Sequence, residues 1–429
     1  MKLYSNKTVH SADKTTKMWI LSEKIFLFMI AYVAVARVWF AFADSYYSSA
    51  FSIFNRLMNY LCVIAGGLLV LKYASARKFN NIKLELCFLS SVYFLLCTFY
   101  TVNGENIITS IFAFITCLIY VLLTDSMQIR VFNIFYKIIL YSSIFTCLLY
   151  IVYLLGINIG FEVVPYYKGQ VTYAHYIKWF IFAIYESKTE LRLCGLFNEP
   201  GGLGTVCALL FAARYDYMKK WEKAAVLLIV ALSFSLAGFI LVFIFIACKI
   251  ISKNKKNIIF FAVFALIFLI LPYIDFGVEN INALFDRIAI TSTGLAGDNR
   301  TKEWFDIPYN HFLMSSDKWF GMGEGYQFNN DLGGNLSYKT YVVQYGLIGY
   351  GLWLIGWLHC ALKLSKNNKK CLPYILIFFI SLYQRPAVIT GLYGFVILFG
   401  GIKWMQMNSK SYNRLINDRF SSEVKLNEN

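Results

Sequence analysis

An arginine and a carboxylate lie close together in a glycine-rich segment of the chain. Glu199 follows Arg192 by seven positions, which is about two turns if the segment is helical. Pro200 and the glycines up to Gly204 would break or loosen such a helix and free its backbone amides. This combination suits an anionic phosphate with a nearby general base. The alternative is a glycine-rich packing face with a capping arginine.

The longest polar stretch of the chain, 276–339, offers further groups. It contains Arg287, Asp298, Asn299, Arg300, Glu303 and the run 319–325, which is rich in glycine and aromatic residues. Aromatic and polar side chains together suit sugar rings, which present apolar faces and hydroxyl groups. An ordinary solvated loop is the alternative.

Two arginines lie in or next to apolar segments. Arg385 interrupts the last long apolar stretch and would cost about 2.5–3.5 kcal/mol at mid-bilayer on an exposed helix. We therefore expect it to face protein, water or an anion. Arg37 lies inside the first apolar segment, where snorkelling toward the outer interface is the alternative to ligand binding.

Metal and cofactor chemistry has little support in the sequence. The four histidines are isolated, and no HExxH, Asp-x-Asp, Walker or dinucleotide-binding pattern is present. The ten cysteines lie mostly inside apolar runs and form no CxxC pair. We therefore expect no metal, no cofactor and no structural disulfide.

The composition indicates an integral membrane protein. Of 429 residues, 59% are hydrophobic and only 15% are charged, too few to cover the surface of a soluble domain. The apolar runs are apolar on every face, which predicts membrane helices, and no alternating pattern indicates an outer-membrane barrel. The net charge of +16 comes from short basic clusters between apolar runs. Such clusters indicate cytoplasmic loops rather than a nucleic-acid surface.

We predict an all-α fold, a polytopic bundle of about twelve membrane helices forming a single integral domain, 1–429. The expected spans are 24–43, 54–71, 84–101, 107–124, 131–155, 193–213, 224–235, 237–251, 258–275, 340–362, 372–384 and 387–405. The first is a retained helix rather than a signal peptide, and both termini are cytoplasmic. Residues 157–191 and 276–339 form outer loops, with an interfacial amphipathic helix over 173–186.

Two apolar stretches are expected to be hairpins, because basic clusters bracket each of them. Residues 224–251 should turn near 233–238, and residues 372–405 should turn at 384–386. Each arm of the first hairpin would be roughly 18–22 Å long, shorter than the ~30 Å hydrocarbon core. Its turn would therefore lie below the outer surface, at the floor of a cavity.

The layout resembles the O-antigen polymerase (Wzy) family, within the superfamily that includes the O-antigen ligases. The resemblance covers most of the chain and rests on spans, on two outer loops and on short motifs. The motif residues are Arg192, Gly195, Phe197, Glu199 and Pro200, then Arg300 with Gly321 and Gly323, and then Gly346 and Gly349. The ligases typically carry a histidine where this chain has Asn335. Some polymerases have a paired arginine–glycine spacing that is absent here, since Leu203 and His311 stand eleven residues after Arg192 and Arg300.

The resemblance implies a metal-independent, GT-C-like glycosyltransferase in the bacterial inner membrane. It would polymerise undecaprenyl-diphosphate-linked oligosaccharides at the periplasmic face, among membrane lipid and with a possible chain-length regulator as partner. Arg192, Glu199 and Arg300 are then the catalytic candidates, with Glu199 as the base. The candidates for binding diphosphate or glycan are Arg385, Arg287, Arg37 and Asn335. O-antigen ligase and a lipid-linked oligosaccharide flippase are the alternatives.

Overall fold

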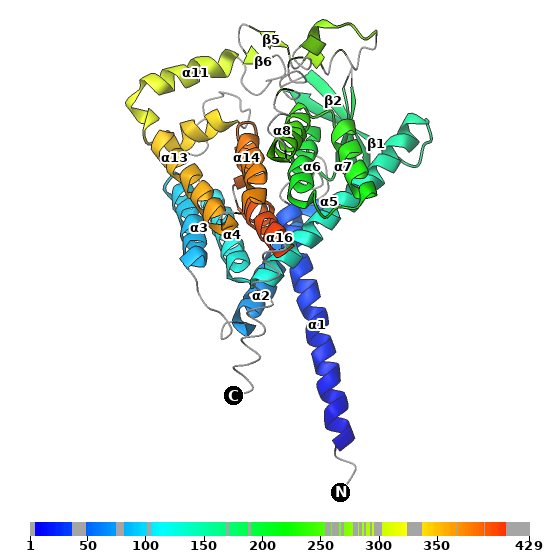
Figure 1. The fold of residues 1–429 in the computed structure, drawn as a ribbon, viewed down its shortest axis with the longest axis vertical. Helices are drawn as coiled ribbons and strands as arrows, with labels where there is room; N and C mark the ends of the chain where they lie inside the picture. The colour runs from blue at the N-terminus through cyan, green and yellow to red at the C-terminus, as the bar shows by residue number, and fades with distance from the viewer. Residues whose placement is uncertain are drawn as a thin grey trace.

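A computed structural model gives the fold of most of the chain. It describes residues 5–36, 49–73, 81–100, 104–168, 171–187, 190–253, 270–277, 303–323, 337–366, 368–389 and 391–408, with 259, 266, 282, 285–286, 289–291 and 294–295. The described chain is mostly helical, with a small sheet at one end (Figure 1).

The helices overlap most of the predicted spans, but the first begins at Ser5 rather than at 24, and the span 193–213 begins in a strand and is helical only from Pro200. They are α1 (Ser5–Ala36), α2 (Ser49–Lys72), α3 (Asn81–Tyr100), α4 (Gly104–Leu122), α5 (Asp125–Leu154), α6 (Pro200–Arg214), α7 (Lys220–Leu232), α8 (Leu236–Lys253), α11 (Glu303–Met314), α13 (Tyr338–Ser365), α14 (Leu372–Ser381), α15 (Leu392–Gly394), the π-helix η6 (Phe395–Gly400) and α16 (Gly401–Met407). By length and composition, α5 and α13 are able to cross a membrane. Most of the expected span 258–275 lies outside the described residues.

Both predicted hairpins are confirmed. The first turns between α7 and α8 at Ser233–Ser235, where Phe234 has a positive φ of 45°. The second turns after α14, and Arg385 lies in that turn. Basic clusters flank each apolar stretch on both sides. Two short arms allow both clusters to lie on the same side of a membrane, which a single span would not.

The outer segment before α6 is a sheet, so the prediction of an all-α fold with a helix over 173–186 is wrong there. The strands β1 (Glu162–Lys168), β2 (Val171–Trp179), β3 (Phe182–Glu186) and β4 (Leu191–Gly195) form an antiparallel meander in chain order. Ile177 pairs with Ile184, and Ile184 with Leu193. All three are buried in the main core, because strand pairing places one face of the sheet against the helices.

The sheet lies at the end of the bundle opposite the start of α1, and so do α11 and the short pair β5 (Ile290–Thr291) and β6 (Gly294–Leu295) (Figure 1). These elements belong to the two segments that were expected to be outer loops. Their position at one end is consistent with the alternating path of the chain.

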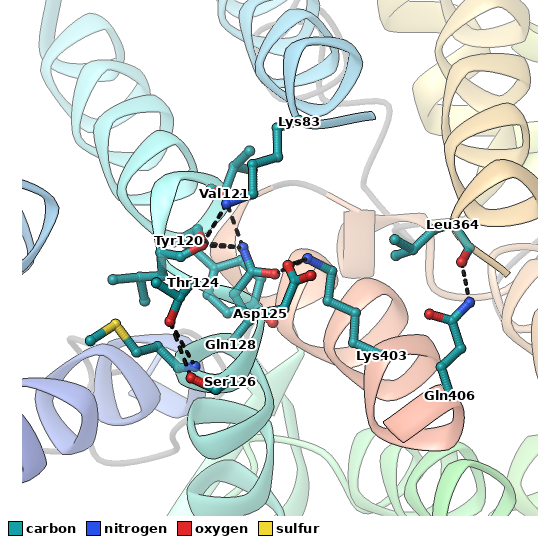
Figure 2. Close-up of polar contacts among 12 residues, drawn as sticks. Lys83, Tyr120, Val121, Thr124, Asp125, Ser126, Gln128, Leu364, Lys403 and Gln406 are labelled. Atoms are coloured by element: carbon teal, nitrogen blue, oxygen red, sulfur yellow. Dashed lines mark hydrogen bonds and ion pairs between the residues drawn. The ribbon is translucent and has the colours of Figure 1, made fainter. Parts of the chain in front are cut away.

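A polar cluster joins helices at the other end of the bundle (Figure 2). The side-chain amide of Gln128 donates to the carbonyls of Tyr120 and Val121, at 2.6 and 3.0 Å. These carbonyls lie in the last turn of α4, where a helix has no internal donors left. Lys403 of α16 donates to Gln128 and pairs with Asp125 at 2.5 Å. The cluster therefore ties α4, α5 and α16 together.

Two further cations strengthen this end. Lys83 of α3 donates to the carbonyl of Leu123 at 3.1 Å, just after α4 (Figure 2). Arg214, the last residue of α6, lies between the rings of Tyr136 and Trp404, at 3.9 and 4.0 Å from their centroids. Such cation–π contacts gain strength where water is excluded. Polar and cation–π contacts thus hold several helices together at this end of the bundle, which is the end predicted to be cytoplasmic.

Candidate functional site

Two candidate residues form an ion pair between the second hairpin and the start of α6. The Nη2 atom of Arg385 lies 2.8 Å from the Oε2 atom of Glu199, although 186 residues separate them in the chain. Glu199 precedes α6 in an extended conformation, and Pro200 opens the helix. The side chain of Glu199 is 46% exposed and that of Arg385 only 18%. A covered cation and an accessible carboxylate therefore meet at one point.

The glycines after Pro200 make room for Arg385. A Cβ atom on Gly201 would lie 2.5 Å from its Nη2 atom, and one on Gly202 would lie 3.6 Å from its Nη1 atom. The guanidinium thus rests on the first turn of α6, where the helix macrodipole is also positive. Two positive groups beside one carboxylate favour the approach of an anion.

Arg192 supports this site from the sheet rather than from a helix. It lies in β4, and its Nε and Nη2 atoms donate to the carbonyls of Ser233 and Phe234, at 3.1 and 2.9 Å. Glu190 lies 3.7 Å from its Nε atom. The last carbonyls of a helix have no donors within the helix, so Arg192 caps that end of the hairpin. The capping-arginine interpretation describes its contacts correctly.

The hairpin turn packs directly on the first turns of α6. A Cβ atom on Gly204 would lie 2.4 Å from the Cβ atom of Ser235, and one on Gly238 would lie 2.9 Å from the backbone of Gly204. The hydroxyl of Ser235 accepts from the backbone N–H of Gly238 at 3.1 Å. Close backbone approach of this kind requires glycine. The glycines of the motif therefore position the hairpin as well as Arg385.

Tyr176 is a supporting residue that sequence reasoning missed. Its hydroxyl donates to the carbonyl of Asn198 at 2.7 Å, one residue before Glu199. Tyr176 is buried on the face of the sheet that also carries Ala183 and Cys194. Only the register of the paired strands could have revealed this contact.

The other glycine motifs pack against each other, with Gly321 on the backbone of Gln344 to Gly346. Gly321 and Gly346 have positive φ angles of 85° and 71°, and Gly346 kinks α13. A Cβ atom on Gly321 would lie 2.3 Å from the carbonyl oxygen of Gln344, so no other residue fits there. At the start of α13, the N–H of Tyr338 donates to the carbonyl of Tyr383 at 3.3 Å. The kinked helix thus contacts the turn that carries Arg385.

Comparisons of the chain with known protein families, curated proteins and solved structures find no match. The geometry of the site therefore carries its functional interpretation. Among the described residues, no three His, Cys, Asp or Glu side chains come close enough to hold a metal ion.

The structure brings together three of the seven candidate residues. Arg385 and Glu199 are paired, and Arg192 holds the neighbouring hairpin turn. The other four candidates lie outside the described residues: Arg37, Arg287, Arg300 and Asn335. The arrangement can bind an anion at Arg385 and accept a proton at Glu199.

Proposed function

We propose that this chain is an O-antigen polymerase, a glycosyltransferase that joins oligosaccharide units carried on undecaprenyl diphosphate. The observation that carries the proposal is the Arg385–Glu199 pair, at 2.8 Å, on the glycine-lined start of α6. A diphosphate leaving group needs a cation, and a sugar hydroxyl needs a base. One residue of each kind is present, and both lie at the end of the bundle that carries the sheet.

In the proposed reaction, the bond between the anomeric carbon of the growing chain and its diphosphate oxygen breaks. A hydroxyl of the next lipid-linked unit forms the new glycosidic bond and gives its proton to Glu199. The electron pair of the broken bond stays with the diphosphate, and Arg385 stabilises the developing charge. Arg300 and Arg287 are further candidates for that charge.

An incoming diphosphate would also change the state of Glu199. It competes with the carboxylate for Arg385, because both are anions that a guanidinium binds strongly. Substrate binding would therefore release Glu199 to act as a base only when a leaving group is present. Arg192 donates to the carbonyls of the hairpin turn, so its proposed role is to hold the turn in place beside the site.

The proposed setting is the bacterial inner membrane, with about twelve spans, a periplasmic site and cytoplasmic termini. The end of the bundle that holds the polar contacts of Lys403, Lys83 and Arg214 would face the cytoplasm. The sheet and α11 would face the periplasm, where the lipid-linked substrates are displayed.

The banding pattern of surface polysaccharide from cells that lack the gene tests this proposal against its alternatives. A core that bears a single repeat unit is expected, because ligation and export continue while elongation stops. Bare core with lipid-linked polymer on the periplasmic side would instead indicate an O-antigen ligase. Bare core with repeat units trapped on the cytoplasmic side would indicate a flippase.

A further inference from the structure

A buried carboxylate lies next to the arginine that holds the hairpin turn. The side chain of Glu190 is only 5% exposed, and its Oε2 atom lies 3.7 Å from the Nε atom of Arg192. Charged side chains are seldom so well covered unless an opposite charge compensates them. Arg192 is itself only 15% exposed, and its hydrogen bonds to the hairpin turn go to neutral carbonyls. Each of these two covered charges therefore compensates the other.

The backbone fixes the place of Glu190 just before β4. The N–H of Ser187 donates to the carbonyl of Glu190 at 2.8 Å, and the N–H of Glu190 donates to the hydroxyl of Ser187 at 3.2 Å. The next residue, Leu191, pairs with Glu186 of β3. The carboxylate therefore starts from a well-defined point, two positions before Arg192.

The hairpin turn connects Arg192 to the candidate site. Arg192 holds two carbonyls of the turn, and the hydroxyl of Ser235 in the same turn donates to the carbonyl of Gly201 at 3.4 Å. The guanidinium of Arg385 lies against Gly201, because a Cβ atom there would be 2.5 Å from its Nη2 atom. A shift of the turn would therefore move the surface on which Arg385 lies.

We propose that Glu190 is a positioning residue, which orients Arg192 and thereby holds the hairpin turn against the start of α6. The inference rests on the proposed function and adds a residue that acts on the reaction through another side chain. A guanidinium without its carboxylate is free to turn towards other acceptors, so its bonds to the turn would weaken. Displacing the groups around a reacting centre by about 1 Å can slow a reaction about 100-fold.

Elongation by Glu190→Gln protein in nanodiscs, at saturating lipid-linked repeat units, tests this role. Glutamine keeps the shape of the side chain and removes its charge, so kcat per folded molecule should fall about ten-fold or more. Glu186→Gln is the matched control, because this carboxylate lies on the neighbouring strand and accepts from the hydroxyl of Tyr153 at 3.1 Å. The control should keep the wild-type kcat. An unchanged kcat per folded Glu190→Gln molecule, or an equal loss in the control, would overturn the inference.

A double-mutant cycle with Arg192→Lys shows whether Glu190 acts through Arg192. Lysine keeps the positive charge and lacks the planar fork, so Glu190→Gln should slow the Arg192→Lys protein hardly further. Losses in kcat that multiply would mean that the two residues act separately, which would overturn the inference.

Unfolding temperatures of the same four proteins separate this inference from the proposed function. If the wild type does not elongate, the polymerase is rejected, and non-additive unfolding temperatures would still show that Glu190 holds Arg192. Elongation by the wild type with an unchanged kcat in Glu190→Gln rejects the positioning role and leaves the polymerase standing.

Discussion

The Arg385–Glu199 pair joins a largely covered guanidinium to a more accessible carboxylate. Glu199 is nearly half exposed, and exposed ion pairs contribute about 0–1 kcal/mol to folding. The guanidinium nevertheless lies close to the start of α6, since a Cβ atom on Gly201 would be 2.5 Å from its Nη2 atom. A residue that contributes little to stability yet is so closely accommodated is a good candidate for contact with substrate.

Glu199→Gln separates these roles. The substitution keeps the shape of the side chain and removes its ability to accept a proton, so elongation of lipid-linked units should fall at least about 100-fold, a typical contribution of a general base. Thermal unfolding of the purified protein should change less than elongation, because the amide oxygen of glutamine can still accept a hydrogen bond from Arg385. Retained elongation in a well-folded Glu199→Gln protein would exclude this carboxylate as the base.

Arg192 should behave in the opposite way. Arg192→Ala leaves the carbonyls of Ser233 and Phe234 without their donor, which costs about 1–3 kcal/mol for a buried group. We expect a lower unfolding temperature in detergent and less protein in the membrane. Arg192→Lys should restore stability only in part, since one ammonium cannot reproduce the planar fork. A fully stable but inactive Arg192→Ala protein would instead show that Arg192 contacts substrate.

The packing of α6 against α8 is the element-scale feature that positions the site. Gly238→Ala would push a methyl group to 2.9 Å from the backbone of Gly204, which cannot move aside. We expect lower thermal stability and weaker elongation, because the hairpin turn and the start of α6 would separate. Gly351→Ala in α13 is the matched control: its Cβ atom has no neighbour within 4 Å. Similar behaviour of the two variants would show that close helix contact is unimportant here.

The sequence predicted the helical elements and both hairpins because their signals are local. Apolar length and flanking lysines are enough to divide 224–251 and 372–405. The sheet escaped prediction even though its strands pair with their neighbours in the chain, as β1 pairs with β2 across a short turn. Taken alone, the aromatic and apolar residues of 173–186 also fit an amphipathic helix at the membrane interface. Their alternation has meaning only once neighbouring strands supply the hydrogen bonds.

The sequence singled out the charged residues of the candidate site, but it did not predict which of them contact one another. Glu199 and Arg385 each stood out as charged groups beside apolar segments, yet nothing in the sequence pairs positions 186 residues apart. Arg192 was expected on a helix with Glu199 and lies instead on a strand. The turn of residues 196–199 therefore separates two groups that helical spacing would have stacked.

For the whole molecule, we expect the end of the bundle that carries the sheet and the opposite end to face opposite sides of the membrane. Val163→Cys lies on β1, and Lys220→Cys lies at the start of α7; both positions are exposed. In intact spheroplasts, an impermeant maleimide should label Val163→Cys, whereas Lys220→Cys should react only after the membrane is opened. Labelling of both sites, or of Lys220→Cys alone, would contradict the proposed orientation.

If the chain is an O-antigen polymerase of the proposed kind, it should elongate lipid-linked glycans by itself, without a metal ion. The most direct measurement incubates the purified protein in nanodiscs with undecaprenyl-diphosphate-linked repeat units and a chelator, and separates the products on a gel. We expect a ladder with a spacing of one repeat unit, which Arg385→Ala and Glu199→Gln should abolish. Repeat units that stay unchanged with well-folded wild-type protein, or a ladder that survives both substitutions, would contradict it.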